Sequence, residues 1–154
     1  MRRISDADLG RVGAAVRDDP AVVLAYVHGS ALRSDREADD LDVALLIEDE
    51  AMGDPVPPVE RAARAIRRET GIEPVDVRLL NLAPVDFRFH VVAAGRCVAA
   101  RDPVRRVRFE AATAGEYQEF RPLLEEYQAA LRRRARREAM RWSTETDSTG
   151  NSNS

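Results

Sequence analysis

The heptapeptide Leu41–Ile47 (LDVALLI) constrains the fold more than any other part of the chain, because it is apolar except for one aspartate. A short run rich in leucine, valine and isoleucine is typical of a buried strand. Side chains alternate between the two faces of a strand, so its apolar residues should face one way while Asp40 and Asp42 face the other. Two carboxylates placed side by side at the edge of a core favour a cation between them.

A second carboxylate-bearing strand follows in the segment Pro74–Leu80 (PVDVRLL), where Asp76 stands between two valines. The same alternation predicts that Asp76 points away from the apolar side of this strand. If the two strands are neighbours, three carboxylates meet, and carboxylate oxygens are the ligands that Mg²⁺ prefers. The sequence therefore predicts a magnesium site formed by Asp40, Asp42 and Asp76.

The residues before these aspartates suit a phosphate. Ala21–Val27 (AVVLAYV) reads as a buried strand, and it is followed closely by Gly29 and Ser30. A strand that ends in Gly-Ser and passes into a helical turn presents backbone N–H groups and a hydroxyl to an anion. The chain has neither the GxxxxGK[ST] nor the GxGxxG phosphate motif. Metal ligands beside a phosphate cradle indicate a nucleoside triphosphate site.

The remaining pattern predicts helices packed on a small sheet, an α/β fold class. Three shorter helices are predicted: residues 6–18 after a Ser5 cap, Val59–Thr70 ended by Gly71, and a helix that begins at Pro84 and stops at Gly95. A long helical region is predicted from Pro103 to about Trp142, with interruptions near Gly115 and Pro122. Arg96–Ala100 is expected to be an edge strand. We expect a single domain over residues 1–142 and a disordered tail over 143–154, because that tail is almost entirely polar.

Composition narrows the class of protein. The 154 residues suit one domain, and no apolar run is long enough for a membrane span or a secretory signal, so we expect a cytoplasmic protein. A single cysteine, Cys97, excludes an internal disulfide and a cysteine-cluster metal site. All 24 basic residues are arginines, and six of them lie in Leu131–Trp142. That run favours a solvated helix end over a nucleic-acid surface.

These motifs together carry a family resemblance. The pattern GS-x9-DxD over Gly29–Asp42, followed by an apolar strand and by the later aspartate of VDVRLL, resembles the DNA polymerase β-like nucleotidyltransferase superfamily. Within it, the chain is similar to the minimal nucleotidyltransferases, the MntA-like antitoxins of MNT-HEPN (type VII) toxin–antitoxin pairs. The segment LAPVDFRFHVVAAGRCVAARDPVRRVRFE also resembles the sequence that follows the third strand in that family. The resemblance implies the polymerase β-like fold with a C-terminal helical extension.

The resemblance also implies roles for individual residues. Gly29 and Ser30 would hold the β and γ phosphates of ATP, and Arg33 either neutralises phosphate charge or shapes the loop. Asp40, Asp42 and Asp76 would bind Mg²⁺, and Asp76 would also help to deprotonate the attacking hydroxyl. The acceptor in such pairs is a tyrosine of a HEPN ribonuclease toxin, which AMP transfer inactivates.

Several alternatives stay open. The chain could transfer nucleotides to a small molecule such as an aminoglycoside, or neutralise a toxin by binding alone, or bind nucleic acid through its arginine-rich helix. Asp39 could replace Asp40 as the functional neighbour of Asp42, although strand alternation favours Asp40. Beside the strand end, His28 is expected to pack rather than to contact nucleotide.

Overall fold

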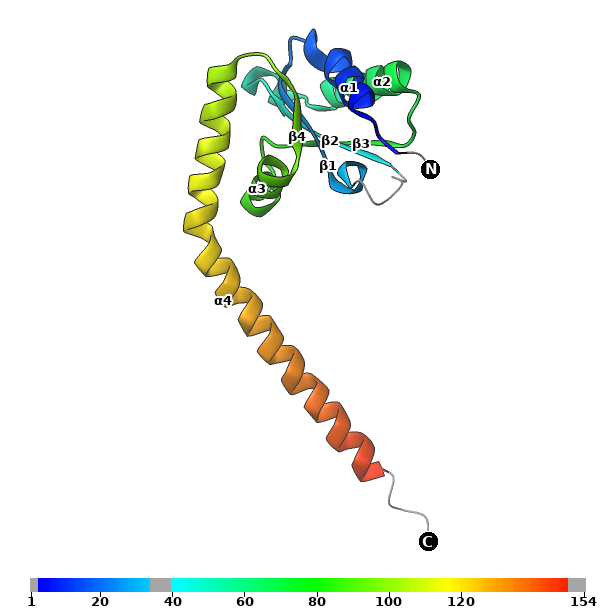
Figure 1. Cartoon of the computed structure of the whole chain (residues 1–154). Helices are drawn as coiled ribbons and strands as arrows, with labels where there is room; N and C mark the ends of the chain where they lie inside the picture. The colour runs from blue at the N-terminus through cyan, green and yellow to red at the C-terminus, as the bar shows by residue number, and fades with distance from the viewer. Residues whose placement is uncertain (1–2, 34–39, 150–154) are drawn as a thin grey trace. The chain divides into compact units, whose positions relative to one another are not determined.

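A four-stranded sheet forms the centre of the fold, with helices on both of its faces (Figure 1). The computed structural model describes residues 3–33 and 40–149. The elements in chain order are α1 (Asp6–Arg17), β1 (Val22–His28), the 3₁₀ turn η1 (Gly29–Leu32), β2 (Leu41–Ile47), the 3₁₀ turn η2 (Asp49–Gly53), α2 (Val56–Thr70), β3 (Val75–Leu79), α3 (Val85–Ala94), β4 (Arg96–Ala100) and α4 (Pro103–Thr149). The chain divides into two compact units, residues 1–115 and 116–154, and the first holds all four strands.

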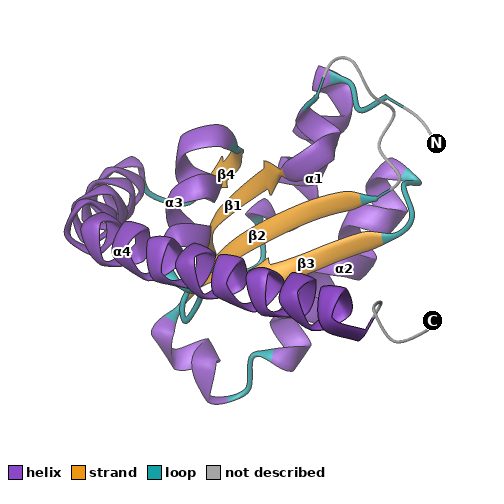
Figure 2. Cartoon of the chain, turned by 90° about the horizontal axis from the view of Figure 1, so that it is seen from below, coloured by secondary structure: helices purple, strands orange, loops and turns teal. Residues whose placement is uncertain are grey.

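The sheet is mixed, and its strand order is β3-β2-β1-β4. Strand β1 is antiparallel to β2 and to β4, whereas β2 is parallel to β3 (Figure 2). A parallel pair needs a crossover connection, and α2 provides it between β2 and β3. The prediction of a small sheet flanked by helices is confirmed, and so is the edge position of Arg96–Ala100.

One face of the sheet packs against α1 and α2. Leu41, Val43 and Leu45 of β2 are fully buried there. They meet Val12 of α1 and Ile66 of α2, both also fully buried. Burial of side chains of this size stabilises the fold by roughly 1.5–3 kcal/mol each. The predicted alternation of β2 is therefore confirmed on its apolar side.

The opposite face packs against α3 and the start of α4. Tyr26 and Ala44 from the sheet are fully buried with Val91 of α3, and Phe109 of α4 packs against this second cluster. The Tyr26 hydroxyl donates a hydrogen bond of 2.8 Å to Glu110 of α4. Burial, followed by this hydrogen bond, raises the pKa of Tyr26, so its hydroxyl stays protonated and remains a donor. This contact joins the first turns of α4 to the centre of β1.

Local signals account for most helix ends. Ser5 and Asp8 form a reciprocal capping box at the start of α1. Gly71 ends α2 in the left-handed conformation, with φ +69°. Helix α2 begins at Val56, three residues before the predicted start. The first turn of a helix has no intrahelical partners for its N–H groups, so the two prolines after Val56 fit there.

Helix α4 differs most from the sequence-based expectation. It was predicted to break near Gly115 and Pro122, but it is described as continuous from Pro103 to Thr149. Pro122 removes one backbone hydrogen bond, and the Glu, Gln, Ala, Leu and Arg residues around it are strong helix formers. Residues 143–149, expected to be disordered, are helical, and residues 150–154 lie outside the described ranges. In the described ranges, no helix is long and apolar enough to cross a membrane.

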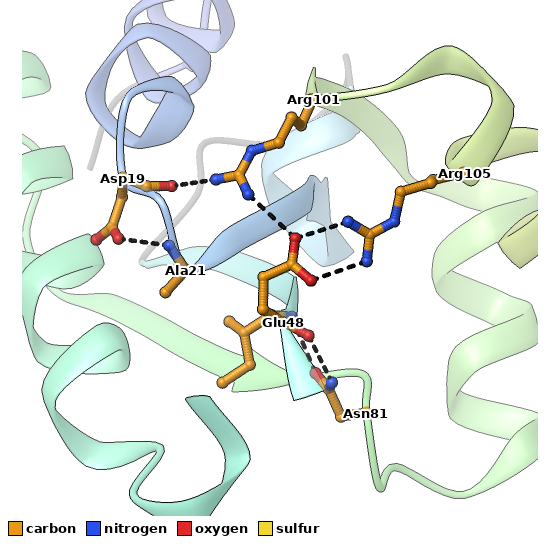
Figure 3. Close-up of polar contacts among 7 residues, drawn as sticks. Asp19, Ala21, Glu48, Asn81, Arg101 and Arg105 are labelled. Atoms are coloured by element: carbon orange, nitrogen blue, oxygen red, sulfur yellow. Dashed lines mark hydrogen bonds and ion pairs between the residues drawn. The ribbon is translucent and has the colours of Figure 1, made fainter. Parts of the chain in front are cut away.

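A polar cluster fastens the carboxyl end of β2 (Figure 3). Glu48 accepts hydrogen bonds from Arg101 at 3.1 Å and from Arg105 at 2.6 Å. The Asn81 side chain bonds both the N–H and the C=O of Ile47, at 3.0 and 2.8 Å. These contacts tie β2 to the chain that follows β3 and β4. The opposite end of β2 carries the aspartates.

Candidate functional site

The ends of three neighbouring strands, β1, β2 and β3, lie side by side at one end of the sheet. Strand β1 terminates at this end, whereas β2 and β3 begin there, because β1 is antiparallel to β2 and β3 is parallel to it. In the register of the sheet, His28 lies opposite Asp42, and Asp42 lies opposite Asp76. Residues paired in this way point to the same face. The sheet therefore places His28, Asp42 and Asp76 in one row across three adjacent strands.

The row lies on the α3 side of the sheet. Leu41 and Val43, the neighbours of Asp42, belong to the core on the other side. Asp40 comes directly before β2 and is half-buried. The prediction that Asp40, Asp42 and Asp76 bind a metal stays a prediction, although the structure pairs Asp42 with Asp76. Asp39 lies outside the described residues.

Electrostatics show that the carboxylates influence one another. The pKa of Asp42 is raised above the ordinary value of 3.8, first by burial and then by the negative charge of Asp40, with a smaller contribution of the same sign from Asp76. His28 and Arg78 oppose this shift. A cation at this place would relieve the repulsion, and oxygen donors from acidic side chains suit a hard divalent ion.

The described side chains do not form a compact group of metal ligands. Among residues 3–33 and 40–146, no three His, Cys, Asp or Glu side chains are close enough together to hold a metal ion. Asp76 instead accepts a hydrogen bond of 3.2 Å from Nε of Arg78. The donor set of acidic side chains nevertheless fits Mg²⁺ by its chemistry.

Gly29 brings the chain against the Asp42 carboxylate. Its φ is +77°, a backbone conformation that residues with a Cβ rarely adopt. A Cβ at this position would lie 2.6 Å from Oδ2 of Asp42. The turn after β1 therefore requires glycine twice, for its backbone conformation and for this close approach.

Gly29, Ser30, Leu32, Arg33 and Ala94 line an open cleft of about 440 Å³ next to this turn. The helical turn predicted after Gly-Ser is present as η1, but it has only four residues. So short a turn has little dipole, because the dipole sums over aligned peptides. The predicted phosphate contacts of Gly29, Ser30 and Arg33 therefore depend on the cleft and on individual N–H groups.

Two residues of this face were missed in the sequence. The Arg78 guanidinium carbon lies 5.7 Å from the centroid of the Phe87 ring, and that ring meets His28 edge-on with centroids 5.5 Å apart. Packing was the expected role of His28, and the structure agrees. Arg78 had a readable signal, since it stands two residues after Asp76 and so shares its face. Phe87 had none, because its position depends on how α3 packs.

Residues 12–104 match the family described as polymerase beta nucleotidyltransferases, and these residues include β1, β2 and β3. The chain belongs to this nucleotidyltransferase family. The polymerase β-like fold class is thus confirmed. No protein of curated function shows significant sequence similarity to this nucleotidyltransferase.

Solved structures with a similar fold include toxin–antitoxin complexes. A chain of the MntA-HepT toxin–antitoxin structure is 18% identical, with a TM-score of 0.55 over 80% of this chain and 99% of that one. A chain from the tri-AMPylated Shewanella oneidensis HEPN toxin in complex with MNT antitoxin is also 18% identical, with a TM-score of 0.54 over 79% and 97%. A toxin–antitoxin structure with AMP-PNP gives 20% and 0.54 over 78% and 98%. At these identities the likeness shows the fold.

Proposed function

We propose that this nucleotidyltransferase is the antitoxin of an MNT-HEPN (type VII) toxin–antitoxin system. It transfers AMP from ATP to a tyrosine of its HEPN ribonuclease toxin and thereby inactivates the toxin. The observation that carries the proposal is the pairing of Asp42 with Asp76 beside the Gly29 turn, on a family fold that transfers nucleotides. The similar structures, which contain toxin–antitoxin pairs and AMP-PNP, support the partner and the donor. Use of ATP would place the reaction in the cytoplasm.

The reaction joins the acceptor oxygen to the α phosphorus of ATP. The bond between that phosphorus and the bridging oxygen breaks, and pyrophosphate leaves with the electron pair. Asp76 accepts the proton of the attacking hydroxyl, because it is more exposed than Asp42 and lies on the edge strand β3, where an acceptor group can reach it. Gly29 and Ser30 hold the phosphates through backbone N–H groups and a hydroxyl, with Arg33 beside them in the cleft.

Asp40, Asp42 and Asp76 would hold Mg²⁺, which when bound neutralises phosphate charge and orients the transferred group. The chain's own contribution is positioning, because this chemistry needs alignment more than a strong protein nucleophile. The fixed register between β2 and β3 provides that alignment for Asp42 and Asp76.

The test is the intact mass of the cognate HEPN toxin after incubation with this protein, ATP and Mg²⁺. We expect a gain of one or more AMP units with the wild-type protein, and none with Asp40→Asn or Asp42→Asn. Asp54→Asn serves as the matched control, because it removes the same charge from an exposed loop outside the row.

Unmodified toxin in a stable complex with the wild-type protein and with both site variants would refute the enzymatic proposal. That result would favour neutralisation by binding. Transfer to an aminoglycoside in the absence of any toxin modification would favour the small-molecule alternative.

A further inference from the structure

Arg78 forms an ion pair with Asp76, one of the carboxylates that we propose as metal ligands. It lies on β3 two residues after Asp76, and both side chains are on the α3 side of the sheet. Its Nε donates to Oδ2 of Asp76 at 3.2 Å. The two side chains are 59% and 46% exposed, so solvent screens this pair and its strength is modest.

The guanidinium of Arg78 also lies over the ring of Phe87. The Arg78 guanidinium carbon is 5.7 Å from the centroid of the ring, within the range of a cation–π interaction. The ring itself is fixed, since Phe87 packs against the second core cluster and meets His28 at an interplanar angle of 86°. Arg78 thus contacts both the Phe87 ring and the Asp76 carboxylate, which limits the entropy cost of keeping the ion pair.

The positive charge of Arg78 reaches beyond Asp76. In the register of β2 and β3, Asp42 lies opposite Asp76, and Arg78 lies opposite Ala44, two residues after Asp42 on the same face. The guanidinium is therefore a near neighbour of both paired carboxylates in the sheet.

We propose that Arg78 is a built-in counter-ion of Asp76, which a divalent cation must displace when it binds to Asp76 and Asp42. The inference rests on the proposed metal role of these acids. A guanidinium within hydrogen-bond distance of a ligand oxygen both occupies that oxygen and repels the incoming cation. Arg78 is thus a positioning residue: it fixes the Asp76 carboxylate before loading and weakens the binding of metal alone.

The test measures Mn²⁺ binding to the full chain without nucleotide, from the electron paramagnetic resonance signal of unbound Mn²⁺ at constant low ionic strength. Removing one positive charge a few ångströms from the site, in surroundings open to solvent, should lower the Kd of Arg78→Gln about 3- to 10-fold. Arg61→Gln is the matched control, because it removes a similar exposed arginine from an ion pair with Asp19 at 3.0 Å, away from the row.

A charge-preserving variant and a double variant locate the effect. Arg78→Lys should keep a Kd within about twofold of the wild type if charge sets the affinity. In the Asp76→Asn background, Arg78→Gln should give no further lowering of the Kd, since the gain is made through Asp76. In ¹⁵N spectra, the Nε–H signal of Arg78 should shift as Mg²⁺ saturates the site, because its acceptor is lost.

Equal Kd values for Arg78→Gln, Arg61→Gln and wild type would overturn the inference, as would an unmoved Arg78 signal at saturating Mg²⁺. Neither measurement needs nucleotide or toxin. A lack of AMP transfer to the toxin therefore refutes the proposed function alone, and unchanged Mn²⁺ affinity refutes the counter-ion alone.

Discussion

Replacing Gly29 by alanine tests the geometry of the site most directly. At φ +77°, an alanine costs about 1–2 kcal/mol of backbone strain. Its Cβ would lie 2.6 Å from Oδ2 of Asp42, but 3.5 Å from Cγ, so only the carboxylate oxygen must move. The loss of stability should thus be little more than the strain, about 2–8 °C in Tm. If Asp42 holds the metal as proposed, moving its carboxylate oxygen by about 1 Å should reduce AMP transfer about 100-fold.

The chain supplies a control for the strain. Gly71 has nearly the same conformation, φ +69°, with no atom within 4 Å of its would-be Cβ. Gly71→Ala should therefore lower Tm by a similar amount while leaving AMP transfer and Mn²⁺ affinity unchanged. Thermal unfolding followed by circular dichroism measures the first effect, and initial rates of toxin modification measure the second.

The reasoning fails if Gly29→Ala transfers AMP as fast as Gly71→Ala. It also fails if Gly29→Ala lowers Tm far more than Gly71→Ala, because the clash would then involve more than one carboxylate oxygen.

Three further perturbations probe other contacts. Tyr26→Phe removes the 2.8 Å hydrogen bond to a glutamate of α4 and should lower the free energy of unfolding in urea by about 1 kcal/mol, without a change in Mn²⁺ affinity. The pKa of Glu48 is lowered from its ordinary value of 4.5, chiefly by the hydrogen bond from Arg105. The ionised Glu48 therefore stabilises the folded state above pH 4.5, and this stabilisation is lost as the pH falls through the lowered pKa. The Tm values of wild type and Glu48→Gln should converge over that pH range. The pKa of Asp42 is raised by burial and then by Asp40, so protonation of Asp42 should begin to weaken Mn²⁺ binding at a pH above 3.8, which a titration of Mn²⁺ affinity against pH measures.

Local pattern was sufficient for the strands that build the site. Leu41–Ile47 was predicted with the observed bounds, because alternation and β-branched residues are properties of the segment itself. Likewise Gly71 ends α2 through its own backbone freedom. The continuity of α4 through Pro122 was not predicted, because it depends on the sum of helix propensities over many neighbouring residues, which here outweighs the cost of one proline.

The sequence predicted the residues of the candidate site, whose role stays a prediction, and it predicted their meeting only if the two aspartate-bearing strands are neighbours. That Asp42 lies opposite Asp76 depends on strand order and register, which are set by packing and by the α2 crossover. The ring of Phe87 against His28 likewise follows from the docking of α3 on the sheet. Arg78 is an intermediate case: strand alternation predicts which face of the sheet it lies on, but not that its guanidinium donates to Asp76.

The parallel pairing of β2 with β3 also bears on how the site appears during folding. A hairpin-like pair such as β1 and β2 forms from nearby sequence, whereas β3 can join β2 only after α2 has folded back across the sheet. Contacts between distant parts of a chain form slowly, because the entropy of loop closure is lost before the contacts can stabilise the chain. Asp76 therefore reaches Asp42 late, and in a chain still emerging from the ribosome the proposed nucleotide site is incomplete until the third strand is released. Cation binding would thus report completed folding of the sheet, and a stalled or truncated chain would be silent in that assay.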